Sequence, residues 1–316
     1  MVYAERAGVE STEILLRKAG FTVSQTCRSR PSCFDFAARQ KDRLVFVKIQ
    51  ADIDSLCPLD SMELRNISTD ISACPLFIAE KARDKPLEDD TVYSRYGVLA
   101  LTSQTLENIL FRDMHPLIQA GPGGYYVEID GSALRIRRQE MGLSVGKLAQ
   151  MVGISRRTLY GYERGMAKSS VSVAYKMITA MGIPIAKSMD IFAPARKQRE
   201  CRILMTAKRL IAKNRLLNKI FQKFDKCKVT AVRKAPFDFM IVVPEGKMRI
   251  IGGITDPKER QLDRRIDEIL SVSKIVEAHP VLLTQRHRLT DKDISCIQDE
   301  ELAKIRNPEE LIDHVT

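Results

Sequence analysis

The residues at positions 143–165, LSVGKLAQMVGISRRTLYGYERG, constrain the fold of this chain more than any other segment. Ser144 and Ser155 are good N-cap residues, so each marks the start of a helix. Between the two helices, Gly153 supplies a residue that adopts a positive φ at little cost, as a tight turn requires. Ala149 is small, where two helices must approach closely. The spacing therefore predicts two short helices joined by a tight turn.

Apolar residues on both sides of this helix pair predict a five-helix bundle over about residues 132–192. Two further helices are expected after the pair, at about residues 170–181 and 184–190. Glu163 is expected to pair with an arginine of the first helix, such as Arg135, because unpaired buried charges are rare. The apolar side chains that recur at helical spacing are expected to form the core, and they are Leu134, Ile136, Met141, Leu148, Val152, Ile154, Leu159 and Tyr162.

The positive charge of the chain is concentrated in its middle. The net charge is +11, but residues 131–234 hold 24 Lys and Arg against 5 Asp and Glu, whereas the remainder holds 27 against 35. Paired surface charges do not produce so large a local excess. We therefore interpret the basic middle as a surface for a polyanion, with nucleic acid as the favoured partner.

The N-terminal flank has the pattern of an α/β domain. Helices are expected at residues 5–19, at residues 59–72 and from about Ser103. A GPGG sequence at Gly121–Gly124 breaks the pattern, and we place a domain boundary near it. Short runs rich in apolar and β-branched residues predict strands at Phe21–Cys27, Phe34–Arg39, Leu44–Gln50, Pro75–Ala79 and Gly97–Leu101.

The C-terminal part repeats this plan. The tripeptide FDF occurs at Phe34–Phe36 and again at Phe237–Phe239, each time before a second apolar run, RLVFVKI or KMRIIGGI. ISACPLFIAEK, which starts at Ile71, matches VEAHPVLLTQR, and LTSQTLENI, which starts at Leu101, matches IQDEELAKI. The three matches keep their order with small gaps between them. We infer two degenerate copies of one α/β domain with the helical bundle inserted between them.

Composition excludes several other kinds of site. The seven cysteines are scattered without a CxxC pair, and the four histidines are equally dispersed. This favours reduced thiols in the core over a zinc site or a disulfide framework, and we expect no metal and no cofactor. The sequence has no long apolar run, and its N-terminus carries acidic residues where a signal peptide would be apolar. We therefore expect a cytoplasmic protein with no membrane partner.

A basic amphipathic segment follows the bundle. Residues 195–226 have apolar side chains at helical spacing with Lys and Arg between them, which predicts one long helix. The favoured interpretation is the first helix of the second α/β copy. Phosphate contacts by Arg196, Lys197 and Arg199 are a second hypothesis. Binding to a membrane surface is a third, disfavoured because nothing indicates a free end or an aromatic anchor.

The segment at residues 143–165 resembles the core of the Cro/CI-type helix-turn-helix family, whose second motif helix enters the DNA major groove. At one position the chain departs from that family, which usually has Gln or Glu at the start of the first motif helix where this chain has Val145-Gly146. The polar contact made from that position is therefore not expected here. The residues that carry the resemblance are Leu148, Ala149, Gly153, Ile154, Ser155, Leu159, Glu163 and Gly165.

The resemblance implies which residues would contact DNA. Arg156 and Arg157 would open the recognition helix and point at base edges or nearby phosphates, where arginine makes bidentate bonds to guanine. Tyr160 would lie one turn further on the same face, and Gly161 would leave that face open to close approach. The remaining members would bind phosphates. The full implied set is Ser155, Arg156, Arg157, Thr158, Tyr160, Gly161 and Lys168.

The arrangement of the whole chain also resembles an archaeal family of helix-turn-helix transcriptional regulators. The fold class that this implies is multidomain α+β, with a central all-α bundle of the Cro/CI type flanked by two similar α/β domains. We expect the N-terminal α/β domain at residues 1–125 and the helix-turn-helix domain at residues 126–193. Residues 194–316 would hold the basic helix and the second α/β copy.

Each α/β copy resembles the restriction-endonuclease-like fold. That family needs an Asp on one strand and an acid-x-Lys on the next, so that carboxylates hold Mg²⁺ beside a lysine. In the first copy Asp35 and Lys48 are candidates, but Phe46 stands where the second acid belongs. In the second copy Asp238 is present, while the matching run Ile250–Gly252 has neither group. We expect both copies to be non-catalytic, with the two aspartates making structural hydrogen bonds.

Three hypotheses about function follow. The leading one is a sequence-specific regulator of transcription that binds double-stranded DNA as a homodimer and is not an enzyme. The main alternative is a metal-dependent nuclease or DNA-processing protein guided by the helix-turn-helix unit. The third is RNA binding or a scaffold role, against which stands the major groove of A-form RNA, too narrow to be read by a helix.

Overall fold

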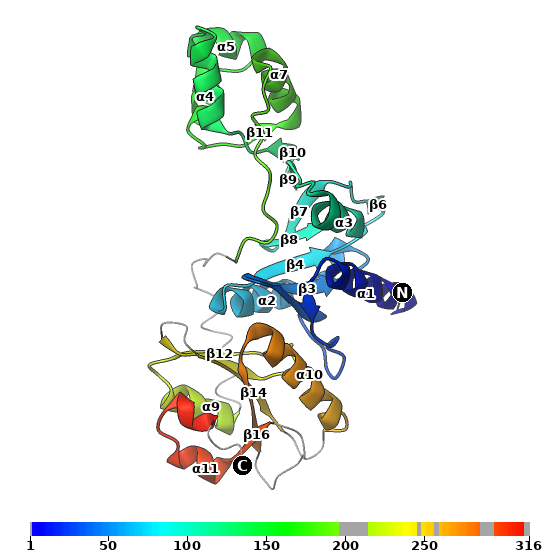
Figure 1. Cartoon of the computed structure of the whole chain (residues 1–316), viewed down its shortest axis with the longest axis vertical. Coiled ribbons are helices and arrows are strands. Elements are labelled where there is room, and N and C mark those ends of the chain that lie inside the picture. The colour runs from blue at the N-terminus through cyan, green and yellow to red at the C-terminus, as the bar shows by residue number, and fades with distance from the viewer. Residues whose placement is uncertain (1, 196–213, 245–247, 256–258, 285–293, 313–316) are drawn as a thin grey trace. The chain divides into compact units, whose positions relative to one another are not determined.

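The computed structural model describes residues 2–195, 214–244, 248–255, 259–284 and 294–312. The chain divides into two compact units. The first contains Met1–Ile78, Tyr96–Val98 and Phe192–Thr316, and the second contains Ala79–Arg95 and Leu99–Ile191. Figure 1 shows the helices and strands of both units.

The N-terminal part of the first unit is a small mixed sheet with helices before and between its strands. Strands β1, β2 and β3 are antiparallel neighbours, and β3 and β4 are parallel. Parallel neighbours need a long crossover connection, which contains α2. The elements in chain order are α1 (Val2–Lys18), β1 (Thr22–Val23), β2 (Phe36–Gln40), β3 (Arg43–Ile49), the 3-10 helix η1 (Ile53–Ser55), α2 (Pro58–Asp70) and β4 (Cys74–Ile78).

The C-terminal part of the same unit has the same plan. Strands β12, β13 and β14 are antiparallel neighbours, β14 and β15 are parallel with α10 between them in the chain, and β16 pairs in parallel with β15. The elements are α9 (Arg215–Lys223), β12 (Lys228–Ala231), β13 (Phe239–Val242), β14 (Arg249–Ile254), α10 (Leu262–Val276), β15 (His279–Thr284), β16 (Ser295–Gln298), α11 (Asp299–Lys304) and the 3-10 helix η3 (Pro308–Leu311).

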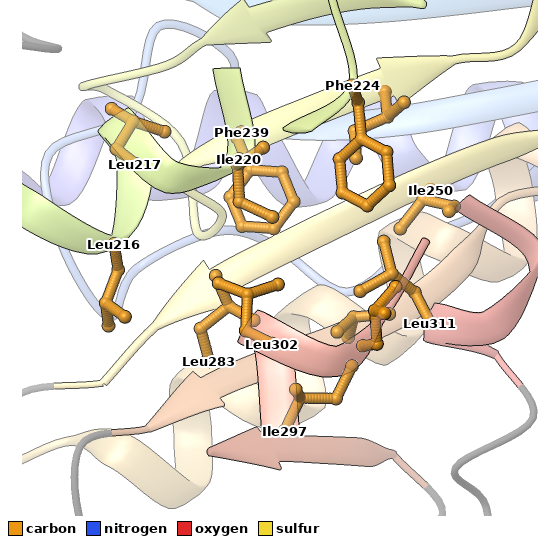
Figure 2. Packing of buried hydrophobic residues seen from close by; sticks show 13 residues of the cluster. Leu216, Leu217, Ile220, Phe224, Phe239, Ile250, Leu283, Ile297, Leu302 and Leu311 are labelled. Carbon is orange, nitrogen blue, oxygen red and sulfur yellow. The ribbon is translucent and has the colours of Figure 1, made fainter. Parts of the chain in front are cut away.

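The core of this C-terminal part lies between the sheet and the helices that cover one of its faces. Helix α9 directs Leu217, Ile220 and Phe224 toward β13 and β14, and Leu302 of α11 joins the same cluster (Figure 2). Alternate residues of the strands, such as Ile250, face these helices, as the two-residue period of a strand requires. The helical spacing of the apolar residues in α9 is therefore explained by packing on this sheet.

Strand register confirms the internal duplication. Phe36 is paired with Val47 across β2 and β3, and Phe239 is paired with Gly252 across β13 and β14. In the parallel pairs, Pro75 of β4 and Pro280 of β15 hold equivalent places. The third sequence match corresponds to the same pair of elements in both copies. It covers the end of β8 (Val98–Leu101) and the start of α3 (Ser103–Arg112) in the first copy, and the end of β16 and α11 in the second. The end of the second match, at residues 285–286, lies outside the described residues.

The two copies contact each other through equivalent elements. Helix α2 packs on β3 and β4 of its own copy and on β12 of the other, whereas α10 packs on β14 and β15 and on β2. Glu63 of α2 accepts hydrogen bonds on Oε1 from the backbone N–H groups of Arg233 and Lys234, in the loop before the second FDF tripeptide. A carboxylate of one copy therefore binds backbone donors of the other.

The reverse contact is made 205 positions further along the chain. Glu268 of α10 accepts hydrogen bonds from the backbone N–H groups of Arg28 and Ser29 at 2.7 and 2.8 Å, in the loop before the first FDF tripeptide. Its side chain is only 1% exposed. Glu63 and Glu268, which we call the paired glutamates, thus make the copies a pseudo-two-fold pair inside one chain.

The second unit combines a small sheet with a helical bundle. In addition to β8 and α3, its elements are β5 (Lys81–Ala82), β6 (Lys85–Pro86), β7 (Thr91–Arg95), β9 (Ile118–Gly121), β10 (Gly124–Val127), α4 (Gly131–Glu140), α5 (Val145–Val152), α6 (Arg156–Glu163), β11 (Ser169–Ser170) and α7 (Val171–Met181). Strand β9 pairs with β7, β10 pairs with β9, and β11 pairs with β10. The GPGG sequence forms the turn of the β9–β10 hairpin.

Some expectations about local structure were wrong. Residues 184–190 are not a helix, because Ala186 forms a β-bridge with Ile129 and the backbone N–H of Lys187 bonds to Glu128. Residues 195–226 are not a single helix, because Asn214 has an extended backbone and its side chain caps the first turn of α9, which ends at Lys223. Of the strand expected at Phe21–Cys27, only the two residues of β1, Thr22 and Val23, form a strand. Arg196, Lys197 and Arg199 lie outside the described residues.

The expectation that all the apolar residues of the bundle are buried was also wrong for two of them. Ile136 and Met141 of the first bundle helix are 56% and 40% exposed, because the helix turns Leu134 and Arg138 to the interior instead. Among the described residues, no helix combines the length and apolar character needed to cross a membrane.

The paired glutamates generate a pH-dependent prediction. Burial raises the pKa of Glu63 in the folded protein. The contribution of this group to folding stability is therefore complete below the pKa of glutamate in the unfolded chain. It is lost as the pH rises through the pKa in the folded protein. Glu63→Gln keeps one oxygen to accept both N–H groups and has no charge to bury. We expect this variant to be at least as stable as the wild type at pH 8, with its relative advantage falling toward pH 4.

Urea unfolding at several pH values measures this difference. Glu63→Ala is the matched control, because it leaves the two N–H groups without their acceptor, and it should cost about 1–3 kcal/mol. Equal destabilisation by the Gln and Ala variants at pH 8 would contradict the assignment.

Candidate nucleic-acid interface

The two motif helices are formed by local capping. The Ser144 hydroxyl accepts a hydrogen bond from the backbone N–H of Lys147 at 3.1 Å and starts α5. Gly153 ends that helix with φ at +74°, a conformation that costs a residue with a Cβ more than it costs glycine. The Ser155 hydroxyl then accepts from the N–H of Thr158 at 3.0 Å and starts α6. The helix starts and the turn were therefore correctly predicted.

A shared apolar core fixes the helices of the bundle. Leu148 of α5 and Leu159 of α6 are completely buried, and Met177 of α7 is buried with them. The bundle helices α4, α5 and α7, which Figure 1 shows together, all contribute residues to this core. Because the inward sides of α5 and α6 are held in this way, the residues on the outer side of α6 have a rigid support.

A buried ion pair joins the first bundle helix to α6. Arg138 donates from Nε to Glu163 Oε1 at 2.6 Å and from Nη2 to Oε2 at 3.1 Å, and its Nη1 bonds to the Leu143 carbonyl at 2.8 Å. The bidentate hydrogen bond to Glu163 raises the pKa of Arg138. The expected pairing of Glu163 with the first helix is confirmed, but the partner is Arg138 and not Arg135, because Arg138 is on the inward face of α4.

The approach of α4 to α6 depends on a glycine that the sequence analysis missed. A Cβ on Gly131 would lie 2.4 Å from the carbonyl oxygen of Glu163 and 2.5 Å from that of Tyr162. These are backbone atoms at the end of α6, so they do not move aside as a flexible side chain does. Gly131 follows Asp130, whose side chain caps α4. The capping residue was a signal for the helix start, whereas no sequence signal marked the close approach.

The outer face of α6 is basic. Arg156, Tyr160 and Arg164 occur at intervals of four residues, so they lie on one side of the helix, and Arg157 and Gly161 lie beside them. The guanidinium of Arg164 lies over the ring of Tyr160, 4.5 Å from its centroid, within the range of a cation–π contact. Arg164 was not among the expected contact residues, although its spacing from Tyr160 was a usable signal.

The other expected contact residues lie at the start of α6 and in the loop that follows it. The Ser155 hydroxyl is 2.8 Å from that of Thr158, so the two hydroxyl groups form a pair at the start of α6. Lys168 lies in the loop after α6, is exposed, and donates from Nζ to Gln119 of β9. The structure therefore brings Ser155, Arg156, Arg157, Thr158, Tyr160 and Gly161 together on α6 and places Lys168 in the next loop.

The position that departs from the Cro/CI pattern is occupied in a different way. Gly146 lies in the first turn of α5, and a Cβ there would be 2.8 Å from Arg156 Nε. The guanidinium of Arg156 thus fills the space that a larger residue at position 146 would need. Helix α5 still begins at Val145 with its cap formed.

The aspartates of the FDF tripeptides lie at the other candidate site, in the first unit. Asp35 directly precedes β2 and accepts from the backbone N–H of Ile49 at 2.7 Å on Oδ2. Its Oδ1 is 2.9 Å from Nζ of Lys48, which also donates to the Ser32 carbonyl. Phe46, at the position of a second acid, is buried with its ring 4.7 Å from that of Phe34.

Asp238 makes the equivalent backbone bond and meets arginines instead of a lysine. Its Oδ2 accepts from the N–H of Ile254 at 2.6 Å and from Arg265 Nη2, and its Oδ1 is 2.8 Å from Nη2 of Arg30 in the other copy. Strand register makes Gly253 the counterpart of Lys48. A Cβ at Gly253 would lie 3.5 Å from Arg265 Nη2. The guanidinium of Arg265 therefore lies next to the position where the first copy has the Lys48 side chain.

These arrangements do not fit a divalent metal ion. Mg²⁺ needs several oxygen ligands, usually with one or two carboxylates, whereas each aspartate here is already bonded to a cation and to a backbone N–H. In the described part of the chain, no group of three or more His, Cys, Asp or Glu side chains is placed to hold a metal. The aspartates make the structural hydrogen bonds expected of them, and we derive no metal-dependent step.

A substitution at Gly131 tests the close approach of α4 to α6. We expect Gly131→Ala to lower the stability of the bundle by about 1–3 kcal/mol, since overpacking against fixed atoms forces backbone shifts. Gly161→Ala is the matched control, because a Cβ there meets nothing within 4 Å, and alanine should raise helix stability by up to about 1 kcal/mol. Thermal unfolding of the two variants compares them, and a Gly131→Ala protein as stable as the wild type would refute the assignment.

Comparison with known proteins matches both parts of this architecture. The family described as a PD-(D/E)XK superfamily domain matches residues 6–116, and the helix-turn-helix family matches residues 134–187. The restriction-modification controller protein C.AhdI of Aeromonas hydrophila has a crystal structure that is 37% identical in sequence, covers 17% of this chain and 82% of that chain, and gives a TM-score of 0.17.

Two archaeal relatives match this chain over nearly all of its length. The HTH-type transcriptional regulatory protein MJ1164 of Methanocaldococcus jannaschii is 33% identical over 308 residues, which is 95% of this chain and 93% of that protein. A protein of the same description from Methanococcoides burtonii is 31% identical over 94% of this chain and 92% of its own length. The chain therefore belongs to the archaeal family of HTH-type transcriptional regulatory proteins.

Proposed function

We propose that this protein regulates transcription by binding double-stranded DNA at specific sequences, with α6 in the major groove. The observation that carries the proposal is the basic outer face of α6. The Ser155 cap and the burial of the inner face of α6 in the bundle core hold this helix in place. The contact residues would be Ser155, Arg156, Arg157, Thr158, Tyr160, Gly161 and Lys168, together with Arg164. Arginine provides the bidentate readout of guanine that such a helix needs.

Charge in the bundle supports this function. Residues 131–190 hold 10 Lys and Arg but only 3 Asp and Glu. Two of these acids are paired with arginines of α4, Glu163 with Arg138 and Glu140 with Arg137. The acids therefore neutralise little of the charge on α6, which leaves it available to phosphates.

We further propose the domain limits 1–125, 126–193 and 194–316, and a homodimer that acts in the cytoplasm, where an archaeal genome lies. Helix-turn-helix proteins of this kind bind half-sites about 34 Å apart as dimers. The paired glutamates already use the contact surfaces of the two α/β copies within one chain. A homodimer would therefore use a different surface.

The α/β copies, in this proposal, are not enzymes. Support comes from the arginine and lysine partners of Asp35 and Asp238, which occupy the carboxylates that a metal would need. The alternative, a nuclease guided by the helix-turn-helix domain, is favoured by the match to the PD-(D/E)XK superfamily.

The experiment that tests the function first is selection of bound duplexes from a random DNA pool at near-physiological salt with Mg²⁺ present. Enrichment of a motif, two-fold symmetric if the protein is a dimer, supports the proposal. Salt-sensitive binding with no motif, or equal competition by an RNA duplex, would contradict it.

Mutation of the recognition helix gives a sharper prediction. Arg156→Ala combined with Arg157→Ala should remove preference among DNA sequences, by roughly 1–3 kcal/mol for each bidentate arginine–guanine pair that is removed, and leave circular dichroism unchanged. Lys168→Ala is the contrasting variant. Removal of a phosphate-binding side chain should weaken binding to all duplexes alike, and should reduce the slope of log binding constant against log salt concentration by about one. Unchanged sequence preference in the double variant would refute the role of α6.

The catalytic alternative makes the opposite prediction about Mg²⁺. We expect incubation of the selected duplex with the protein and Mg²⁺ to leave the DNA intact, as judged by denaturing gel electrophoresis. Cleavage by the wild type that Asp35→Ala abolishes would establish a nuclease instead. A Phe46→Glu variant, which restores only the second acid, is a control that tests whether this one substitution is enough to produce Mg²⁺-dependent cleavage.

A further inference from the structure

The contact between Gly146 and Arg156 joins the starts of the two motif helices. A Cβ on Gly146 would lie 2.8 Å from Nε, 3.1 Å from Cζ and 3.2 Å from Nη2 of Arg156. All three atoms belong to the guanidinium group, so this group lies directly against the backbone of α5. Any residue other than glycine at position 146 would displace it.

This contact restricts a side chain that is otherwise free to move. Arginine loses rotamer entropy when it is ordered, so an arginine that is already placed binds DNA at a smaller entropic cost. Within the described part of the chain, Arg156 makes no ion pair that would hold it elsewhere. The guanidinium of Arg156 therefore lies in the space beside Gly146, from which a side chain at position 146 would exclude it.

We propose that Gly146 is a positioning residue for DNA recognition: because it has no side chain, the guanidinium of Arg156 can lie against α5, and this placement determines base preference where Arg156 contacts the site. The inference rests on the proposed function and adds to it a residue that does not itself touch a base. It also gives a physical role to the position at which this chain departs from the Cro/CI pattern.

The role is separable from stability. The atoms that a new Cβ would meet are the end of a flexible, exposed side chain, which swings away at little cost. Alanine also favours a helix more than glycine does. Gly146→Ala should therefore keep or slightly raise the melting temperature while releasing Arg156. Gly8→Ala adds the same methyl group to a helix outside the bundle, α1, where the nearest atom is Ile49 Cγ2 at 3.4 Å, an ordinary van der Waals contact, and it serves as the control.

A double-mutant cycle on the full-length protein tests the inference. Dissociation constants of the wild type, Gly146→Ala, Arg156→Ala and the double variant are measured on the selected duplex and on duplexes with single base-pair changes. We expect Gly146→Ala to reduce preference by about fivefold or more, at the same base pairs as Arg156→Ala. In the double variant, Gly146→Ala should add nothing to the reduction caused by Arg156→Ala.

The outcomes separate this inference from the proposed function. A wild type with no sequence preference overturns both. A wild type with preference overturns the inference alone if Arg156→Ala leaves that preference unchanged, if Gly146→Ala behaves as the wild type, or if the two effects add in full. Gly8→Ala should not change preference at the base pairs that Arg156 determines, and the same change in both glycine variants would also contradict a specific role for Gly146.

Discussion

Removing a carboxylate from water is unfavourable unless hydrogen-bond donors or a cation replace the lost hydration, and both units of this protein are organised by that requirement. Glu268 is 1% exposed and is satisfied by backbone N–H groups of the other α/β copy. Glu163 in the bundle is satisfied by the fork of Arg138. In each case the acid and its donors come from different elements, so satisfying the acid also fixes how those elements pack.

The same requirement accounts for the state of the two FDF sites. An aspartate beside a strand of a PD-(D/E)XK domain is suited to hold a metal together with a second acid. Here Phe46 fills the position of that acid in the first copy, and Asp35 is bonded to Lys48. In the second copy Arg265, itself 1% exposed, takes the place of the lysine. The charge that a metal would have balanced is balanced by side chains of the protein.

The bundle separates residues that support from residues that are displayed. Leu159 and Tyr162 of α6 face the core, while Arg156, Tyr160 and Arg164 face outward. Local caps set where the helix begins, and the buried ion pair and the close contact at Gly131 set where it lies relative to α4. A recognition helix held at both ends in this way presents its arginines with little freedom of the backbone.

The sequence by itself determined the features that depend on neighbouring residues. Ser144, Gly153 and Ser155 act through local hydrogen bonds and backbone conformation, so the motif helices were predictable, and the repeated FDF tripeptide revealed the duplication. Only the tertiary structure decided which residues meet across elements: that Arg138 and not Arg135 binds Glu163, that Ile136 is exposed, that residues 184–190 are not a helix, and that Glu63 and Glu268 join the copies. These outcomes depend on which face of a helix is buried and which backbone donors come near it, and a one-dimensional pattern contains neither.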